Sequence, residues 1–373
     1  MNKVIDLGEI PLVNNLCNTK EESLNAKRYP LRVFQDENMV MKLDTEIDSE
    51  EMFGQYLYRS SVNVPYINHC KKMWYEVQRF EPKRIIDIGG NDGALLRAFQ
   101  SQANYKLDLV NVDVSSSFKD VNENSGIKYY NNYWGDIDIG KADVITSTNV
   151  FQHNPNVHKF LSGIKKHLDG IWILEFPYFL TTAKTNQFDQ IYHEHVYYWL
   201  MTPLMKLFSQ YGLGVMSISK QSIHGGSLRV MLTNKHSGTP GVADKILEQE
   251  KKFDFSSWGT NIHLKIMSDQ TFFDDYKGKI ACFGAAAKGC VYLNAINMNQ
   301  RFSYVVDDTI DKQGKYMPGT GLKIMNRDFL YQDQPDCLLI LAHNFKDYII
   351  DSLRPHYKGK IIVMIPELEI YDW

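Results

Sequence analysis

From Lys83 onward, short apolar runs alternate with amphipathic segments in which apolar residues recur every three or four positions. Short apolar runs predict buried strands, and the amphipathic segments predict helices. Strands that alternate with helices form a parallel sheet with crossover helices. We therefore expect an α/β fold in this part of the chain.

The alternation occurs in two sets separated by a charged stretch. The first set predicts strands at 84–88, 107–112, 143–147 and 171–175, with helices at 94–101 and 157–168. After an aromatic-rich insertion, a helix at 204–211 precedes strands at 215–219 and 228–233, which we expect to close the sheet as an antiparallel pair. The second set predicts strands at 279–283, 304–306, 337–341 and 361–365, and helices that begin at 287 and near 346.

Residues 1–80 lack this regular pattern and contain Pro11, Pro30 and Pro65. We interpret them as a small, irregular N-terminal lid lobe. A first α/β domain is expected over 81–235. Residues 236–373 should form a helical connector and a second, Rossmann-like α/β domain. At 373 residues the chain is long enough for such an arrangement.

Charge and cysteine content narrow the class of protein. The 41 basic and 44 acidic residues nearly balance, which favours neither nucleic acid nor an anionic membrane as a partner. No apolar run approaches the roughly 18 residues of a membrane span. The five cysteines include no Cys-x-x-Cys pair, as expected of a reduced cytoplasmic protein. The sequence indicates no oligomeric state, and a monomer is compatible with it.

The segment Asp87-Ile-Gly-Gly-Asn-Asp-Gly93 lies where the first predicted strand turns into a helix. Ligands bind at this place in open α/β sheets, and Gly89 and Gly93 allow the backbone to approach a ligand closely. Asp113 ends the next predicted strand, where an acidic residue accepts hydrogen bonds from ribose hydroxyls. An adenosine-containing cofactor is therefore expected here.

The polar residues of this turn discriminate between two cofactors. A dinucleotide requires Gly-x-Gly-x-x-Gly to seat its pyrophosphate, whereas this turn contains Asn91 and Asp92. A carboxylate repels pyrophosphate but suits the cationic methionine part of S-adenosylmethionine, which we prefer. A glycine-rich turn without a ligand is the alternative.

Several motifs, in order along the chain, resemble the nucleotide-sugar C-methyltransferase family. They are Leu7-Gly-x-x-Pro11-Leu-x-Asn14, Tyr29-Pro-Leu31, Tyr56-x-Tyr58-x-Ser60-Ser61, Gly89-x-Asn91-Asp92-Gly93, Asn149-Val-x-x-His153, Tyr192-His-Glu-His195, His224-Gly-Gly-Ser-Leu-Arg229, Gly284-Ala-Ala-Ala-Lys-Gly289, Asp311-Lys-Gln-Gly314, Pro318-Gly319 and Leu339-Ile-Leu-Ala342. The resemblance implies a class I methyltransferase domain with S-adenosylmethionine as cofactor and S-adenosylhomocysteine as product. It also implies a nucleoside-diphosphate keto-deoxysugar as substrate, methylated on a carbon alpha to its ketone.

The chain departs from the family at its N-terminus, where the family has a zinc lobe built from cysteine pairs. After Tyr29-Pro-Leu31 this chain reads Gln35-Asp-Glu-Asn38, and the first cysteine pair is missing. We therefore predict no structural zinc. Because such a site contributes folding free energy, other packing must hold this lobe, with candidates Phe34, Met39, Val40, Met41 and Leu43.

Methylation of carbon requires a base and stabilisation of the enolate that forms. Histidine is the natural base near neutral pH. In the resemblance, His195 matches the base, while Tyr192 and Glu194 orient substrate oxygens and help the charge to shift. A structural histidine or half of a metal site with His193 are the alternatives, but no third ligand at metal-site spacing is evident.

Four further residues have both a functional and a structural interpretation. Tyr56 and Tyr58 either close over the sugar, as the resemblance implies, or pack the lid on the core. His153 either touches the cofactor or caps the helix at 157–168. Asn149 follows the third predicted strand, where it would lie near the methionine group.

The turn Gly284–Gly289 resembles a second phosphate-binding turn, but Ala286 replaces the middle glycine of a dinucleotide site. We expect it to place Lys288 near the substrate diphosphate, with a purely bracing domain as the alternative. His224 lies in a glycine-rich segment that would approach the sugar or diphosphate. Arg229 would pair either with a phosphate or with a local carboxylate.

The leading hypothesis is therefore C-methylation of a nucleoside-diphosphate keto-deoxysugar with His195 as general base. A sugar O- or N-methyltransferase on the same scaffold is one alternative. A nicotinamide-dependent sugar-nucleotide oxidoreductase that uses Gly284–Gly289 is another, because Asp307 ends the next predicted strand. The sequence specifies neither the sugar, the nucleotide, the carbon nor the pathway.

Overall fold

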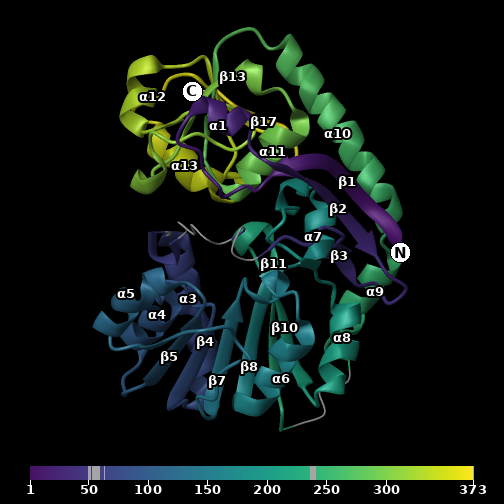
Figure 1. Ribbon diagram of the computed structural model, residues 1–373, viewed down its shortest axis with the longest axis vertical. Helices are drawn as coiled ribbons and strands as arrows, with labels where there is room; N and C mark the ends of the chain where they lie inside the picture. The colour runs from purple at the N-terminus through teal and green to yellow at the C-terminus, as the bar shows by residue number, and fades with distance from the viewer. Residues whose placement is uncertain (49–51, 53–58, 63, 236–240, 373) are drawn as a thin grey trace.

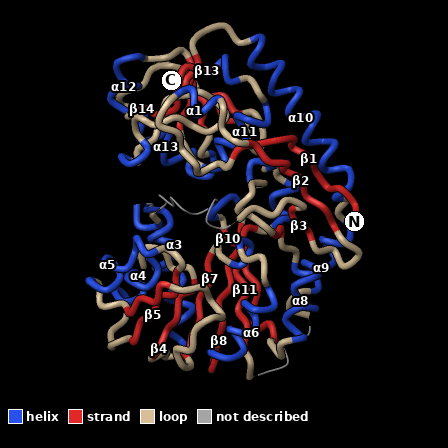
Figure 2. The backbone as a smooth tube through the Cα atoms, viewed as in Figure 1, coloured by secondary structure: helices blue, strands red, loops and turns tan. Residues whose placement is uncertain are grey.

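The computed structural model describes residues 1–48, 52, 59–62, 64–235 and 241–372. Two lobes, each built on a mostly parallel sheet, lie one above the other, with the N-terminal strands beside the long helix α10 (Phe255–Asp275) of the upper lobe (Figures 1 and 2). The lower lobe contains the first predicted alternating set, and the upper lobe contains the second.

The lower lobe has a seven-stranded sheet in the order β10-β11-β8-β7-β4-β5-β6. Its strands are β4 (Arg84–Ile88), β5 (Asp108–Asp113), β6 (Lys128–Asn131), β7 (Ala142–Thr148), β8 (Leu168–Pro177), β10 (Gly214–Gln221) and β11 (Ser227–Thr233). Strand β11 runs antiparallel to both of its neighbours, as predicted for a closing pair. All strands predicted for this sheet are present, and β6 is an addition.

Helices cover both faces of this sheet, so its strands are apolar on both sides. They are α3 (Val64–Val77), α4 (Ala94–Gln102), α5 (Lys119–Asn124), α6 (Val157–His167), α7 (Phe179–Lys184) and α8 (Met201–Gln210), with 3₁₀ turns η1 (Ser60–Val62), η2 (Gln78–Phe80), η3 (Ser116–Phe118), η4 (Phe151–His153), η5 (Phe188–Gln190) and η6 (Ile223–Gly225). Ile85 packs in the cluster with α3 and α4, whereas its neighbour Ile86 packs in the cluster that contains α6. Alternate side chains of a strand point to opposite faces, which explains the continuous apolar runs.

The upper lobe has a six-stranded sheet in the order β14-β13-β12-β15-β16-β17. Its strands are β12 (Ile280–Phe283), β13 (Phe302–Val306), β14 (Ile324–Met325), β15 (Cys337–Ile340), β16 (Lys360–Val363) and the antiparallel β17 (Glu369–Tyr371). The helices are α9 (Asp244–Lys252), α10, α11 (Ala287–Ile296), α12 (Arg327–Asp333) and α13 (Lys346–Leu353), with η7 (Asn299–Arg301), η8 (Ile310–Lys312) and η9 (His343–Phe345). Across the sheet, the order β14-β13-β12-β15-β16 repeats the order β6-β5-β4-β7-β8 of the lower lobe. In both sheets the strands that come third, second, first, fourth and fifth along the chain lie next to one another in that order.

The N-terminal region is a small antiparallel sheet, so the expectation of an irregular lobe was wrong. It contains β1 (Asn2–Pro11), β2 (Arg28–Gln35) and β3 (Met41–Leu43), joined by α1 (Lys20–Leu24) and extended by β9 (Tyr197–Tyr198) from the aromatic insertion. Two register shifts break the alternation of β1, which hid the strand in the sequence pattern. The strand crosses α10 closely, because a Cβ on Gly259 would lie 2.1 Å from the carbonyl oxygen of Val4.

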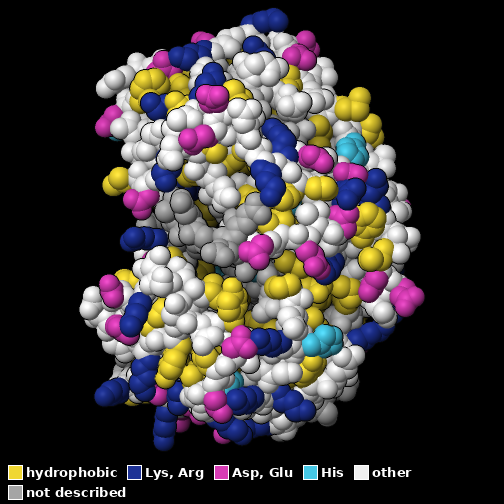
Figure 3. Space-filling model, viewed as in Figure 1, with side chains coloured by type: hydrophobic (Ala, Val, Ile, Leu, Met, Phe, Trp, Pro, Cys, Tyr) yellow, Lys and Arg dark blue, Asp and Glu magenta, His cyan; other side chains and the backbone are white. Residues whose placement is uncertain are grey.

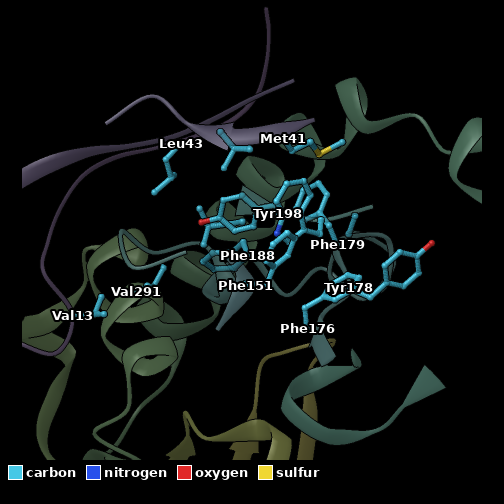
Figure 4. Packing of buried hydrophobic residues seen from close by; sticks show 14 of the residues in the cluster. Val13, Met41, Leu43, Phe151, Phe176, Tyr178, Phe179, Phe188, Tyr198 and Val291 are labelled. Atoms are coloured by element: carbon cyan, nitrogen blue, oxygen red, sulfur yellow. The ribbon is translucent and has the colours of Figure 1, made fainter. Parts of the chain in front are cut away.

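One apolar cluster joins the N-terminal sheet to both lobes (Figure 4). It contains Val13, Met41 and Leu43 from the N-terminal region, Phe151 and Phe176 from the lower lobe, Phe179, Phe188 and Tyr198 from the insertion, and Val291 from α11. Of the five residues proposed to hold this region, Met41 and Leu43 are buried, and Met39 and Val40 are partly buried against the same cluster. Phe34 is half-buried in β2.

Basic and acidic side chains are interspersed on the face shown in Figure 3, in agreement with the balanced composition. In the part of the chain that the structure describes, no helix combines the length and apolar character needed to cross a bilayer.

Candidate active site

The turn between β4 and α4 can only be built with glycine at two of its positions. Gly89 and Gly93 have φ angles of 64° and 77°, a region that residues with a side chain rarely adopt. A Cβ would lie 2.4 Å from a methyl of Val150 at Gly89, and 2.2 Å from the Oδ1 of Asn122 at Gly93. The backbone of this turn is thus held close to two neighbouring segments.

Two buried asparagines, which sequence reasoning missed, hold the turn from behind. Asn111 in β5 accepts a hydrogen bond from the Gly90 amide (3.1 Å) and donates to the carbonyl of Asn91 (3.0 Å). Asn122 in α5 donates to the same carbonyl (3.1 Å). Neither side chain is exposed to solvent. An asparagine in the middle of an apolar strand, as at Asn111, was the signal that could have identified this role.

Asp113 lies at the end of β5, beside the turn, as predicted. Its carboxylate accepts from the amides of Asn91 (2.8 Å) and Ser115 (2.9 Å). Burial nevertheless raises the pKa of Asp113, with the two amide hydrogen bonds acting in the opposite direction. Its position at the carboxyl end of the strand is the one from which an acidic side chain reaches ribose hydroxyls.

The carboxylates of this turn fit a cationic ligand. Thr146 donates to Oδ1 of Asp87 (2.7 Å), but the buried Oδ2 has no hydrogen-bond partner among the described residues. The Oδ1 of Asp92 is likewise buried without a hydrogen-bond partner among the described residues, and Nη2 of Arg97 lies 3.9 Å from it. Burial raises the pKa of Asp87 to about 7. A buried, unpaired carboxylate oxygen is costly, so a cation brought near this turn would be stabilised there.

Residues Asn149–His153 connect the turn to the second half of the site. Val150 touches Gly89, as described above, and the Asn149 amide donates to the carbonyl of Glu175 (2.8 Å). His153 donates from Nδ1 to the carbonyl of Glu194 (2.7 Å), and burial lowers its pKa to about 4. The structure therefore places His153 against the predicted catalytic cluster, although the sequence assigned it to the cofactor or to a helix cap.

His195 is held in a defined orientation inside the protein. Its Nδ1 lies 2.9 Å from the carbonyl oxygen of Gln190, and only 4% of the residue is exposed. The ring centroid lies 3.9 Å from that of Tyr192 and 4.9 Å from that of His153. Because a carbonyl can only accept, Nδ1 carries the proton and Nε2 keeps its lone pair. Burial, reinforced by His153, holds the pKa of His195 well below the ordinary value of histidine.

Glu194 faces the N-terminal region, a contact that sequence reasoning missed. The Nδ2 of Asn14 donates to its Oε1, and burial raises the pKa of Glu194 to about 7. His193 points elsewhere, with Nε2 3.3 Å from the carbonyl of Pro30 and its ring against Tyr29. The structure thus brings the rings of Tyr192 and His195 together, directs the Glu194 carboxyl to Asn14, and separates His193 from His195.

Two of the predicted substrate ligands, His224 and Lys288, lie together. Lys288 donates from Nζ to the carbonyl of His224 (3.2 Å), which also accepts from the Nε2 of Gln190. His224 has a φ of 54°, and its Nε2 is buried without a hydrogen-bond partner among the described residues. Burial lowers the pKa of Lys288 to about 8, and burial together with Lys288 lowers that of His224 to about 4.

Arg229, one of the predicted substrate ligands, pairs with carboxylates of the protein instead. Its Nε donates to Glu175 (2.9 Å), Nη1 donates to Glu76 (2.7 Å), and Nη2 lies 2.9 Å from Nε2 of His69. The Arg229 side chain is 3% exposed and that of Glu175 is fully buried. The local carboxylate, rather than a phosphate, is therefore its partner, because each of its guanidinium nitrogens is already engaged.

The turn after β12 repeats the geometry of the turn after β4. The Ala285 amide donates to Asp307 (2.8 Å), as Asn91 does to Asp113, and the Thr309 amide donates to its other oxygen (2.9 Å). A lysine outside the turn, Lys312 in η8, lies beside the acidic residue of this second site. Its Nζ lies 3.7 Å from the Asp307 carboxylate and donates to the carbonyl of Ala285 (2.8 Å). This ammonium neutralises the acidic group on which a second dinucleotide site would depend.

Two predictions are limited by which residues the structure describes. Tyr56 and Tyr58 lie outside the described residues, so the proposed contact with the sugar stays a prediction. Within the described ranges, no three His, Cys, Asp or Glu side chains are grouped closely enough to hold a metal ion.

Family models and a relative of known class agree with these features. A model described as a methyltransferase domain matches residues 69–218, and one described as a C-methyltransferase C-terminal domain matches 222–366. The chain is 28% identical over 392 residues to the C-methyltransferase NovU of Streptomyces niveus, covering 98% of this chain and 93% of that protein. Similar solved structures include the YcgJ protein of Bacillus subtilis, 14% identical over 45% of this chain and 99% of that one with a TM-score of 0.37. Another is the 1,6-didemethyltoxoflavin-N1-methyltransferase of Burkholderia thailandensis, 12% identical over 52% of this chain and 93% of that one with a TM-score of 0.38.

The seven-stranded sheet with its antiparallel β11, the turn at Gly89–Gly93 and the matched methyltransferase domain define an S-adenosylmethionine-dependent methyltransferase. Within this class, the relative that matches 98% of the chain and the family model that matches residues 222–366 are both described as C-methyltransferases. Over most of its length the chain is therefore similar to the C-methyltransferases.

Proposed function

We propose that the protein methylates the carbon alpha to the ketone of a nucleoside-diphosphate keto-deoxysugar, with His195 as general base. The observation that carries the proposal is the state of His195, a buried imidazole whose Nδ1 is fixed on the Gln190 carbonyl. The substrate class comes from the ordered motifs that resemble the nucleotide-sugar C-methyltransferases.

A neutral imidazole suits the first step of C-methylation. Since the pKa of His195 is held below its ordinary value, the ring is unprotonated at pH 7 and Nε2 can accept a proton from the substrate carbon. Proton transfer leaves an imidazolium on His195 and an enolate on the substrate. The same low pKa makes His195 a weak base, so the enolate must itself be stabilised by neighbouring groups.

Glu194 is suited to stabilise the enolate. With its pKa raised to about 7, a large fraction of the carboxyl is protonated near neutral pH and can donate a hydrogen bond to the enolate oxygen. A buried carboxylic acid serves as such a donor in other enzymes that form enolates. In our proposal Tyr192, whose ring centroid lies 3.9 Å from that of His195, orients the same substrate oxygen.

The remaining predicted residues bind the two ligands. S-adenosylmethionine, when bound, supplies a methyl group carried on a sulfonium. Asp113 would accept from its ribose, and Asp87 and Asp92 would stabilise its positive charge, while Asn149 and His153 line the path to His195. Lys288 and His224 would bind the substrate diphosphate, because Lys288 brings an ammonium within 3.2 Å of the His224 carbonyl.

Methyl transfer to oxygen or nitrogen is the alternative within this class of enzyme. Methyl transfer to oxygen or nitrogen requires no enolate. It therefore does not explain why His195 is held as a neutral base or why the pKa of Glu194 is raised to about 7. A nicotinamide-dependent reaction is disfavoured by Lys312, which pairs with the acidic residue of the second turn.

Two experiments test the proposal. Thymidine-, cytidine-, guanosine- and uridine-diphosphate keto-sugars are incubated with S-adenosylmethionine, and the product is analysed by mass spectrometry. A single added methyl group that resists ether cleavage is expected. Substrate in deuterated water without the methyl donor should exchange its alpha hydrogen, and His195→Ala should abolish this exchange. Unchanged exchange in the variant would remove His195 from the mechanism.

A further inference from the structure

A buried contact between a carboxyl group and an imidazole joins the segment that carries His195 to the C-terminal lobe. Asp189 lies in η5, and His343 lies in η9, directly after β15. The Nε2 of His343 is 2.8 Å from the Oδ2 of Asp189, and the side chains are 6% and 1% exposed. The two residues are 154 positions apart, so the contact depends entirely on the packing of one lobe against the other.

Stability alone does not explain this pair. The space around it is lined by apolar side chains, including those of Tyr292, Leu341 and Ile365. The second oxygen of Asp189 is buried without a hydrogen-bond partner among the described residues, and Lys288 is the other charged group that acts on it. Apolar side chains of similar volume are usually as stabilising as a buried ion pair. A pair in such surroundings can instead serve to fix the relative position of the elements it joins.

The element that this pair holds is the one that orients His195. Gln190 follows Asp189 in the same 3₁₀ turn, and its carbonyl accepts the Nδ1 proton of His195 (2.9 Å). A shift of η5 would therefore move the acceptor, and with it the ring and the nitrogen that keeps the lone pair. Small displacements of reacting groups have large effects on rate, since a misplacement of about 1 Å can lower the rate about a hundredfold.

We propose that Asp189 and His343 are positioning residues for His195, so that the C-terminal lobe sets the orientation and the tautomer of the base. Neither residue touches the substrate or the cofactor in this assignment. The importance of the orientation for catalysis rests on the function proposed above, but the orientation itself can be measured without any substrate.

The decisive variants separate stability from position. In Asp189→Leu/His343→Leu both hydrogen-bonding side chains are replaced by apolar side chains, so the protein should still fold. His343→Gln keeps a side-chain donor for Asp189. His263→Gln, on the exposed face of α10, is the matched control. Thermal unfolding and binding of S-adenosylhomocysteine establish that each full-length protein is folded.

The first measurement is the ¹⁵N spectrum of the histidine rings, with the His195 signals assigned through His195→Gln. Wild type, His343→Gln and His263→Gln should show His195 as the neutral Nδ1-protonated tautomer. The leucine pair should move the His195 nitrogen shifts toward a mixture of tautomers. An unchanged His195 spectrum in the folded leucine pair would overturn the proposal. This result does not depend on which substrate the enzyme uses.

The second measurement uses any substrate identified by the screen above. The leucine pair should lower kcat by about tenfold or more because the base is displaced, and it should also raise KM because Asp189 acts on Lys288, which binds the substrate in our proposal. His343→Gln should retain a kcat close to that of wild type. Equal loss in both variants, or a rise in KM alone, would contradict a positioning role.

Discussion

Glu194→Gln tests whether the buried carboxyl of Glu194 is protonated near neutral pH. Glu194 is 4% exposed, and burial raises its pKa from an ordinary 4.5 to about 7. The native state therefore binds this proton more tightly than the unfolded chain does. Stability is highest below the unfolded pKa and is lost as the pH rises through the folded pKa. At about 1.4 kcal/mol per pKa unit, a shift of roughly 2.5 units amounts to about 3 kcal/mol.

Glutamine keeps an oxygen that can accept from Asn14 and carries no charge at any pH. In urea denaturation without ligands, the variant should lie within about 1 kcal/mol of wild type at pH 5 and be about 3 kcal/mol more stable at pH 8. Glu248→Gln, an exposed position on α9, is the control and should show no such difference between the two pH values. An equal gap between Glu194→Gln and wild type at pH 5 and pH 8 would refute the reasoning.

Two other changes test the cofactor turn and the buried ion network. Gly93→Ala forces a side chain onto Asn122 and should weaken binding of S-adenosylhomocysteine at least about tenfold by calorimetry. Gly126→Ala, with a similar φ of 76° but nothing within 4 Å, should leave that affinity unchanged, and equal losses would argue against the turn as the binding site. Arg229→Met leaves His69 as the remaining side-chain partner of the fully buried Glu175 and should lower the free energy of unfolding by about 3–5 kcal/mol. A change below about 1 kcal/mol would contradict a structural role for Arg229.

The strands and helices of the two lobes could be predicted because their pattern is local. Strand β4 has the predicted start and end, and helix α13 begins where it was expected, since apolar runs there are bounded by glycine or charged residues. The N-terminal strand β1 could not be predicted in the same way. Its bulges interrupt the alternation of apolar and polar residues, and its burial comes from α10, more than 240 positions further on in the chain.

In the candidate site, too, local motifs could be predicted from the sequence and contacts between distant residues could not. The glycines and carboxylates of the cofactor turn and the cluster around His195 form compact motifs, so their residues could be singled out from the sequence. The contacts of Asn14 with Glu194 and of His343 with Asp189 join residues 180 and 154 positions apart. A single sequence contains no information on such proximity. For Arg229, the sequence left a phosphate and a carboxylate open, and the fold decided in favour of the carboxylate.

The pairing of the N-terminal strands has a consequence for how the chain folds during synthesis. Strand β3 pairs with β9, β1 packs on α10, and the backbone of Cys17 pairs with that of Tyr316 in an isolated β-bridge. The N-terminal strands therefore meet these partners only after synthesis has passed β9, α10 and Tyr316. The lower sheet, complete by Thr233, can form earlier. Because exposed strand edges invite misassembly, we expect the N-terminal region to be the part of the nascent protein that most needs protection by chaperones.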